Sequence, residues 1–446
     1  MKSLVMMIRQ VGESTISIVV SIILFLFNGM KYIVSLPAKL IAYIKEFLAD
    51  TDSVLKESLI ALSICAVGDL CAGIILGNME FFLKTYPGLM VIIPGAIGMR
   101  GNIFGSFGSR LSTHLHIGTL SPEFKRSEIL DENIIASIIL TMVLSVLLAV
   151  IAKVICILFN FESISLYDFV IISFIAGLIS TIIMLPITMF ISLKSFEGGW
   201  DPDNITTPLI AAIGDFFTLP AIILSVMVVN IIGFHPMVKM ILFVIIIIIT
   251  LASLISGYTA EGGVRQIVRQ STPILFLCSI LGTVAGGILN NSISTLLKNQ
   301  TLLTLVPLFS GESGGLVSIL GARLSSALHS GLINPVLKPK KHTIENFIAI
   351  VTLAVVMYPL IGFLAETSTL VFGNVGVGFI HSLSISFVAG MILILIMLLV
   401  VFYISTISYR RGLDPDNIVL PLSTSLTDSI STLILIVVSL GILSMF

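Results

Sequence analysis

The tetrapeptide DPDN occurs twice in a sequence that is otherwise largely apolar, at residues 201–204 and 414–417. Each copy leads into an apolar run with one further aspartate, Asp215 in the first run and Asp428 in the second. Carboxylate and amide oxygens are hard ligands, which suit Mg²⁺, Ca²⁺ or Mn²⁺ better than Cu⁺ or Zn²⁺. The pattern therefore predicts a site for a divalent metal cation.

The elements that must position these acids are transmembrane helices. The chain has 446 residues, of which 57% are hydrophobic and 11% charged, whereas a soluble domain is about 45–50% apolar and about 25% charged. The apolar segments are long and continuous, which is typical of helices rather than of barrel strands. The net charge of −1 makes nucleic acid an unfavourable partner and leaves the lipid bilayer as the expected surroundings.

Helix geometry predicts the depth of the two isolated aspartates. Asp and Asn cap helix starts and Pro is tolerated in the first turn, so DPDN is typical of a helix start. The eleven residues from Asn204 to Asp215 cover roughly 16 Å at about 1.5 Å each, and half of the hydrocarbon layer is about 15 Å. Asp215 and Asp428 are thus expected near the membrane midplane as cation ligands.

Burial gives a reason for a cation between these two acids. A lone carboxylate at the midplane costs at least about 2.5–3.5 kcal/mol, and two facing carboxylates would also repel each other. A cation or a shared proton would relieve both costs. The alternative is that each Asp bonds to a neighbouring helix and has only a structural role.

The acids and amides of the DPDN copies have two interpretations. Capping explains one acid in each copy, whereas a cation-attracting pore mouth would use all of them. The candidate mouth residues are Asp201, Asp203, Asn204, Asp414, Asp416 and Asn417.

A glycine-rich helix is the second candidate element of a pore. Its glycines recur three and four residues apart, which places them on one helical face. Small residues let helices approach closely and expose their carbonyls, and Asn102 offers an amide oxygen to a cation. The candidate pore-helix residues are Gly98, Gly101, Gly105, Gly311, Gly314, Gly315 and Glu312.

An internal repeat relates these elements at an offset of 213 residues. "PGAIGMRGNIFGSFGSRLSTHLHIG" begins at Pro94, and "PLFSGESGGLVSILGARLSSALHSG" begins at Pro307. The same offset relates the two DPDN copies and their aspartates. Each repeat has five predicted spans, and the segment 238–258 adds the crossing that makes the two repeats parallel. We therefore expect a pseudo-twofold axis along the membrane normal and a central pathway between the repeats.

The predicted fold is an all-α polytopic membrane protein with eleven spans, and the segment 14–36 is a candidate twelfth. We expect four parts: an N-terminal segment (1–54), a first repeat (55–232), a linking transmembrane helix (233–267) and a second repeat (268–446). Lys and Arg gather in the loops on the DPDN side, so the positive-inside rule predicts that these loops are cytoplasmic and that the C-terminus is outside. The predicted spans lie at 59–78, 87–117, 134–159, 168–193, 206–232, 238–258, 272–293, 301–331, 346–372, 380–408 and 418–445.

The motif after Pro94, followed by DPDN and Asp215, resembles the membrane domain of MgtE-type magnesium transporters. Two such domains in one chain are similar to solute carrier family 41. The resemblance implies transport of divalent cations, chiefly Mg²⁺ with Mn²⁺ and Co²⁺ as alternatives, through a pore between two five-helix units. It matches Asp215 and Asp428 to the pore aspartate and Asn102 to the Asn of a Gly-Asn element.

Two departures from that family pattern bear on mechanism. Gly315 stands where a second Gly-Asn element would place its Asn. The chain also leaves no length for the cytosolic magnesium-sensing domains of the bacterial proteins, so we expect gating by another route. Because both units lie in one chain, a monomer is expected to suffice as a pseudo-dimer in the plasma membrane.

The residues fit a channel and a coupled carrier equally. A cation-coupled carrier of a small organic solute is the main alternative, although the sequence shows only acids, an amide and glycines to line its pocket. An intramembrane Mg²⁺-dependent prenyltransferase is a weaker alternative, since such enzymes use dissimilar acidic motifs with basic residues beside them. We therefore expect a transporter rather than an enzyme.

Overall fold

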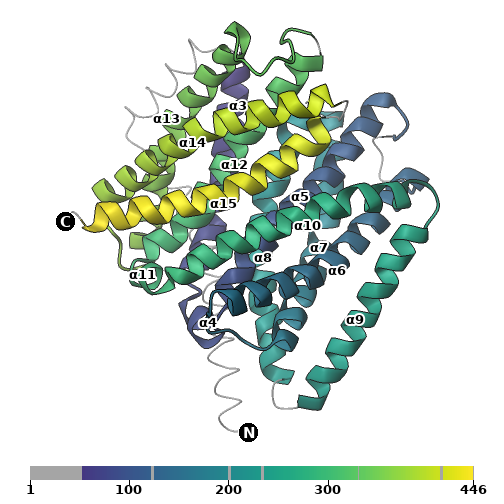
Figure 1. Ribbon diagram of the computed structural model, residues 1–446, viewed down its shortest axis with the longest axis vertical. Coiled ribbons are helices and arrows are strands. Elements are labelled where there is room, and N and C mark those ends of the chain that lie inside the picture. Colours follow the sequence, from purple (N-terminus) through teal and green to yellow (C-terminus); the bar gives the residue numbers. More distant parts are fainter. Residues whose placement is uncertain are drawn as a thin grey trace. The chain divides into compact units, whose positions relative to one another are not determined.

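Helices account for the regular structure of the chain in every part that the structure, a computed structural model, describes (Figure 1). These parts are residues 53–121, 125–198, 202–232, 236–329, 331–411 and 415–444. Within them no strand occurs, and the predicted all-α class is confirmed. The candidate twelfth span at 14–36 lies outside the described residues.

Thirteen helices are found in the described residues, and eleven of them are long and apolar enough to cross a membrane. This confirms the eleven predicted spans. The helices are α3 (Ser53–Gly77), α4 (Glu80–Thr85), α5 (Leu89–Ile117), α6 (Glu128–Leu158), α7 (Leu166–Glu197), α8 (Pro202–Ile232), α9 (Pro236–Thr259), α10 (Gly262–Asn291), α11 (Ile293–Lys298), α12 (Gln300–His329), α13 (Lys341–Val371), α14 (Phe379–Arg410) and α15 (Pro415–Ser444).

Residues 1–60 and residues 61–446 are two separate units, and α3 begins in the first and continues in the second. The residues of α3 that contact the helices described below all belong to the second unit. One span begins earlier than its apolar pattern predicts: α10 starts at Gly262, ten residues before the predicted 272. Its first turns carry Arg265 and Arg269, which the apolar window excluded, and both are exposed.

The long helices form two sets whose bounds repeat at the offset found in the sequence. We call α3, α5, α6, α7 and α8 the first set and α10, α12, α13, α14 and α15 the second set. α13 begins and ends 213 residues after α6, and α14 begins and ends 213 residues after α7. The hydroxyls of Ser127 and Ser165 accept backbone N–H groups at the first turns of α6 and α7, which explains where these helices begin. That the two sets are related by an axis along the membrane normal stays a prediction.

The first helix of each set crosses the second helix of the other set. A Cβ on Gly73 of α3 would lie 2.2 Å from the carbonyl oxygen of Thr304 on α12. A Cβ on Gly286 of α10 would lie 2.2 Å from the carbonyl oxygen of Val91 on α5. Both partners in the second crossing differ from those in the first by 213 positions. Glycine at each crossing lets the two backbones touch, so the two sets interlock.

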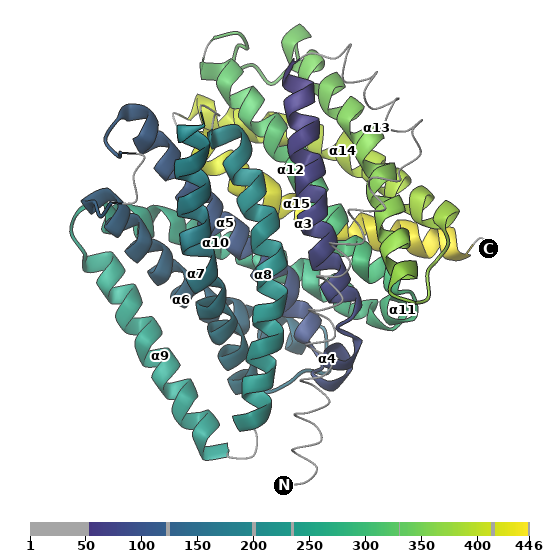
Figure 2. The same cartoon turned by 180° about the vertical axis from the view of Figure 1, so that it is seen from behind.

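α9 lies at the edge of the helices in both views (Figure 1, Figure 2). Most of its large apolar side chains are exposed, including Ile245 and Ile248, which suits a helix that faces lipid. Its inner face packs against α6 and α10 through Leu254, and Lys239 forms an ion pair of 2.7 Å with Asp168 of α7. The helix predicted to link the two repeats is therefore held at two places along its length.

Candidate functional site

A cavity of about 260 Å³ lies among α3, α5, α8, α10, α12 and α15. α5 and α12 line it with matching faces, so that each lining position on α12 is 213 residues beyond one on α5. The matching residues include Pro94 and Pro307, Ile97 and Ser310, Gly98 and Gly311, Gly101 and Gly314, Asn102 and Gly315, and Gly105 and Ser318. The structure thus brings the predicted pore-helix glycines together around one space.

Both isolated aspartates reach this cavity. Asp215 projects from α8 and is only 9% exposed, while Asp428 projects from α15. The hydroxyl of Ser310 on α12 donates to Asp428 Oδ1 at 2.6 Å. The other oxygen, Oδ2, lies 3.1 Å from where a Cβ on Gly98 would stand. Glycine at 98 therefore gives the carboxylate of the second set its room against a helix of the first.

Asn102 joins the two sets of helices. Its side-chain amide donates to the hydroxyl of Ser425 on α15 at 3.1 Å. Its side-chain carbonyl oxygen has no hydrogen bond among the described residues, and Asn102 lines the cavity. The arrangement leaves one hard oxygen donor on the cavity wall.

The structure adds a third acid that sequence reasoning missed. Asp69 of α3 lines the same cavity and is 1% exposed. Its side chain lies against the backbone of Gly311, because a Cβ there would come within 2.2 Å of Asp69 Oδ2. The repeat hid this residue, since its counterpart is Gly282. A lone acid inside an apolar span was the signal available, because such residues are costly and mark functional positions.

Glu312 has a different position from the other candidate acids. It is fully buried on α12 but is not among the cavity-lining residues. Its charge acts on Asp69 and Cys65 of α3 and on Tyr358 of α13. Glu312 therefore lies behind the cavity wall.

The candidate mouth residues are only partly described. Asp201 and Asp414 lie outside the described residues. The backbones of Asp203 and Asn204 lie in the first turn of α8, and those of Asp416 and Asn417 lie in the first turn of α15. Their side chains are not described, so a cation-attracting role at the mouth stays a prediction.

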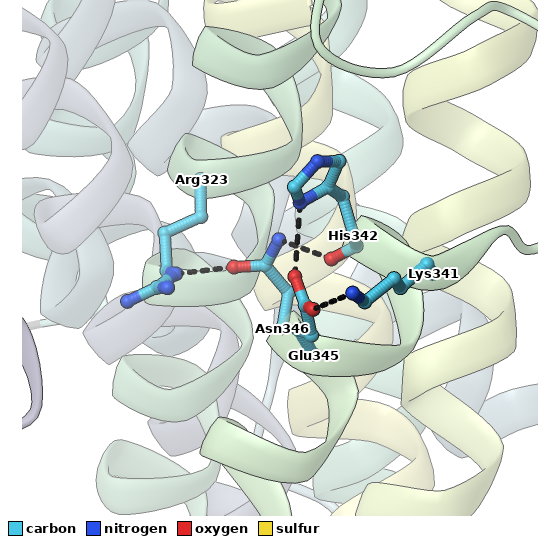
Figure 3. A network of polar contacts seen from close by, with 5 residues as sticks. All are labelled: Arg323, Lys341, His342, Glu345 and Asn346. Atoms are coloured by element: carbon cyan, nitrogen blue, oxygen red, sulfur yellow. Dashed lines mark hydrogen bonds and ion pairs between the residues drawn. The ribbon is translucent and has the colours of Figure 1, made fainter.

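An arginine–asparagine pair recurs on the second and third helices of each set. Arg110 Nε donates to Asn133 Oδ1 at 2.6 Å, and Arg323 Nε donates to Asn346 Oδ1 at 2.5 Å. Figure 3 shows the second pair, in which the amide of Asn346 also donates to the carbonyl of His342. These bonds fix the guanidinium groups by helix-to-helix contacts, so the repeated arginine has a packing role in both sets.

The cavity acids do not form a chelating cluster. Within the described residues, no group of three or more His, Cys, Asp or Glu side chains is placed to hold a metal ion directly. Three carboxylates nevertheless line one space, at Asp69, Asp215 and Asp428. Such a wall suits an ion that keeps its water and contacts one or two carboxylates.

Two stretches of the chain match the same family model. The model, described as MgtE, divalent cation transporter, matches residues 93–225 and again residues 306–438. The chain belongs to the MgtE family. The first matched stretch runs from α5 to Ser225 in α8, and the second runs from α12 to Val438 in α15. Each stretch of this MgtE chain therefore contains one of the two aspartates that reach the cavity.

Relatives of this MgtE chain include members of solute carrier family 41. Member 2 of this family from Xenopus laevis is 22% identical over 416 residues, which cover 85% of this chain and 72% of the relative. Member 3 from Rattus norvegicus is 25% identical over 405 residues, which cover 84% of each chain. No solved structure matches the chain. Together with the eleven apolar helices, the family identifies a multi-pass membrane protein of a divalent cation transporter family.

Proposed function

We propose that this chain transports Mg²⁺ through the cavity between the two sets of helices, with Asp215 and Asp428 as its main ligands. One observation carries the proposal. Two carboxylates at equivalent positions on α8 and α15 reach the same cavity from the two sets. A divalent cation balances two carboxylate charges, and this balance offsets the cost of holding them inside a membrane.

The cavity wall favours an ion that stays partly hydrated. Mg²⁺ gives up water reluctantly and is usually bound by one or two carboxylates. The amide oxygen of Asn102 supplies a further hard donor on the first set, where the second set has Gly315. Mn²⁺ and Co²⁺ are the alternative cargoes, and they would test how strictly the site requires water-mediated contacts.

The glycines of the cavity wall serve the same end. A Cβ on Gly314 would meet no atom within 4 Å, so this position opens directly onto free space. Gly98 and Gly311 instead give room to the carboxylates of Asp428 and Asp69. We propose that the glycines keep the pathway wide enough for a hydrated ion.

The orientation and the assembly complete the proposal. The chain lies in the plasma membrane with both DPDN loops on the cytoplasmic side and the C-terminus outside. An inside-negative potential then favours entry of a divalent cation by roughly 4.6 kcal/mol per 100 mV. One chain supplies both walls of the cavity, so a monomer suffices as a pseudo-dimer, and no enzymatic step is required.

Flux into liposomes tests the proposal. Purified full-length protein is reconstituted around a Mg²⁺-sensitive dye, and uptake is followed with and without an imposed voltage. Asp215→Asn and Asp428→Asn should each reduce uptake at least about tenfold, because a contact with a charged group is worth about 1.5–3 kcal/mol. Asp131→Asn is the control, because Asp131 is an exposed acid at the start of α6. Full uptake by the double variant would overturn the assignment.

A cation-coupled carrier of an organic solute is the second candidate. Pockets for drug-sized ligands occupy about 300–1,000 Å³, and the cavity of about 260 Å³ falls below that range. Thermal melting separates the two candidates: Mg²⁺ should raise the melting temperature, whereas Na⁺ at equal ionic strength should not.

A further inference from the structure

Two acids of the membrane region have no counterpart in the repeat. Asp69 corresponds to Gly282, and Glu312 corresponds to Met99. The structure places both acids at the crossing of α3 and α12, where the side chain of Asp69 lies against Gly311, the residue before Glu312. The repeat that produces the paired aspartates therefore does not explain this second pair.

Both members of the pair are buried without sufficient partners. Asp69 is 1% exposed and Glu312 is fully buried. Asp69 Oδ1 and both carboxyl oxygens of Glu312 have no hydrogen-bond partner within the described part of the chain. An ionised carboxylate in such a place costs several kcal/mol unless a charge or a donor compensates it.

The groups facing the pair are acidic or weakly acidic. Asp69 faces the acids of α8, α12 and α15, and Glu312 faces thiol and phenol groups on α3 and α13. Arg100 of α5 is directed elsewhere, since its guanidinium donates to Ser145 of α6. The facing groups are Cys65, Asp215, Tyr358 and Asp428, together with Cys278 of α10, which faces Asp428.

We propose that Asp69 and Glu312 form a proton-binding site that links proton release to cation transport. Glu312 lies behind the cavity wall, so a hydrated metal cation cannot contact it, whereas a proton can pass to it from Asp69. Asp69 lines the cavity and supplies the connection to solvent. The proposal rests on the proposed function only in naming the cation that drives the release.

Linkage gives the direction of the effect. A divalent cation held by Asp215 and Asp428 adds positive charge beside Asp69, which favours loss of the proton. The coupling is reciprocal, so protons weaken cation binding by the same free energy. If one proton leaves for each bound ion, the Kd for Mg²⁺ falls up to about tenfold for each unit of rising pH.

The test measures Mg²⁺ binding and proton release together. Purified full-length protein is titrated with Mg²⁺ in weakly buffered detergent between about pH 6 and 8, with a pH dye reporting released protons. The wild-type chain should release protons on binding. Glu312→Gln should abolish the release and flatten the pH dependence of Kd while still binding Mg²⁺. Glu345→Gln, which removes an exposed acid on α13, is the matched control.

Several outcomes would overturn the proton site. Undiminished release from Glu312→Gln would do so, and so would Kd values that do not change with pH in the wild-type chain. Asp69→Asn provides a second variant if Glu312→Gln does not fold, and it should also suppress the release. Failure of the proposed function is distinguishable, because Mg²⁺ binding would then survive in the Asp215→Asn, Asp428→Asn double variant.

Discussion

Replacing Gly286 with alanine tests the interlocking of the helices. The new Cβ would lie 2.2 Å from the carbonyl oxygen of Val91, whereas ordinary contact begins at 3.4 Å. The backbones of α10 and α5 must therefore separate by about 1.2 Å, the difference between these two distances. Overpacking of this kind costs about 1–3 kcal/mol, which lowers the ratio of folded to unfolded protein by about 5- to 150-fold.

The matching substitution Gly73→Ala should cost a similar amount, because its Cβ would lie 2.2 Å from the carbonyl oxygen of Thr304. Gly441→Ala is the control, since a Cβ there meets nothing within 4 Å and alanine favours the helix. The assay is equilibrium unfolding in mixed micelles with increasing denaturing detergent. Equal stability of Gly286→Ala and Gly441→Ala would refute the close crossing, and loss at only one crossing would refute their equivalence.

Three further substitutions probe contacts between helices, each by the same unfolding assay. Asn346→Ala should cost about 1–3 kcal/mol, because it leaves the Arg323 guanidinium without its acceptor; unchanged stability would contradict the pairing. Lys239→Met should cost about 1 kcal/mol or less and lose its effect in high salt, since its ion pair with Asp168 is partly exposed. Glu132→Ala should cost about 1.5–3 kcal/mol, because its carboxylate accepts the backbone N–H of Gly263 at the start of α10. A loss below about 0.5 kcal/mol would argue against that bond.

The spans and the paired acids could be predicted from the sequence for a clear physical reason. Apolar runs of about 20 residues are required for any span, and they can be read without knowledge of packing. Asp215 and Asp428 were found because the repeat presents them twice at one depth. Their shared cavity follows from the same repeat, and the bond from Asn102 to Ser425, which joins α5 to α15, is consistent with it.

The remaining features depend on contacts that a single chain pattern does not show. Asp69 was missed because it has no partner at the offset, and Ser310 was missed because serines are common in helices that pack closely. The crossing of Gly73 with Thr304 joins residues far apart in sequence. Apolar periodicity identifies which residues are buried but not which helix buries them.

The interlocked crossings have a consequence for synthesis of the chain. Val91 is made 195 residues before Gly286, the residue that covers it. At about 5–20 residues per second, the ribosome needs roughly 10–40 s to supply that cover. During this interval the helices of the first set are in the membrane with one wall missing. The newly made first half must therefore remain open to the incoming α10, and a chain that stops before Gly262 would stay unfinished.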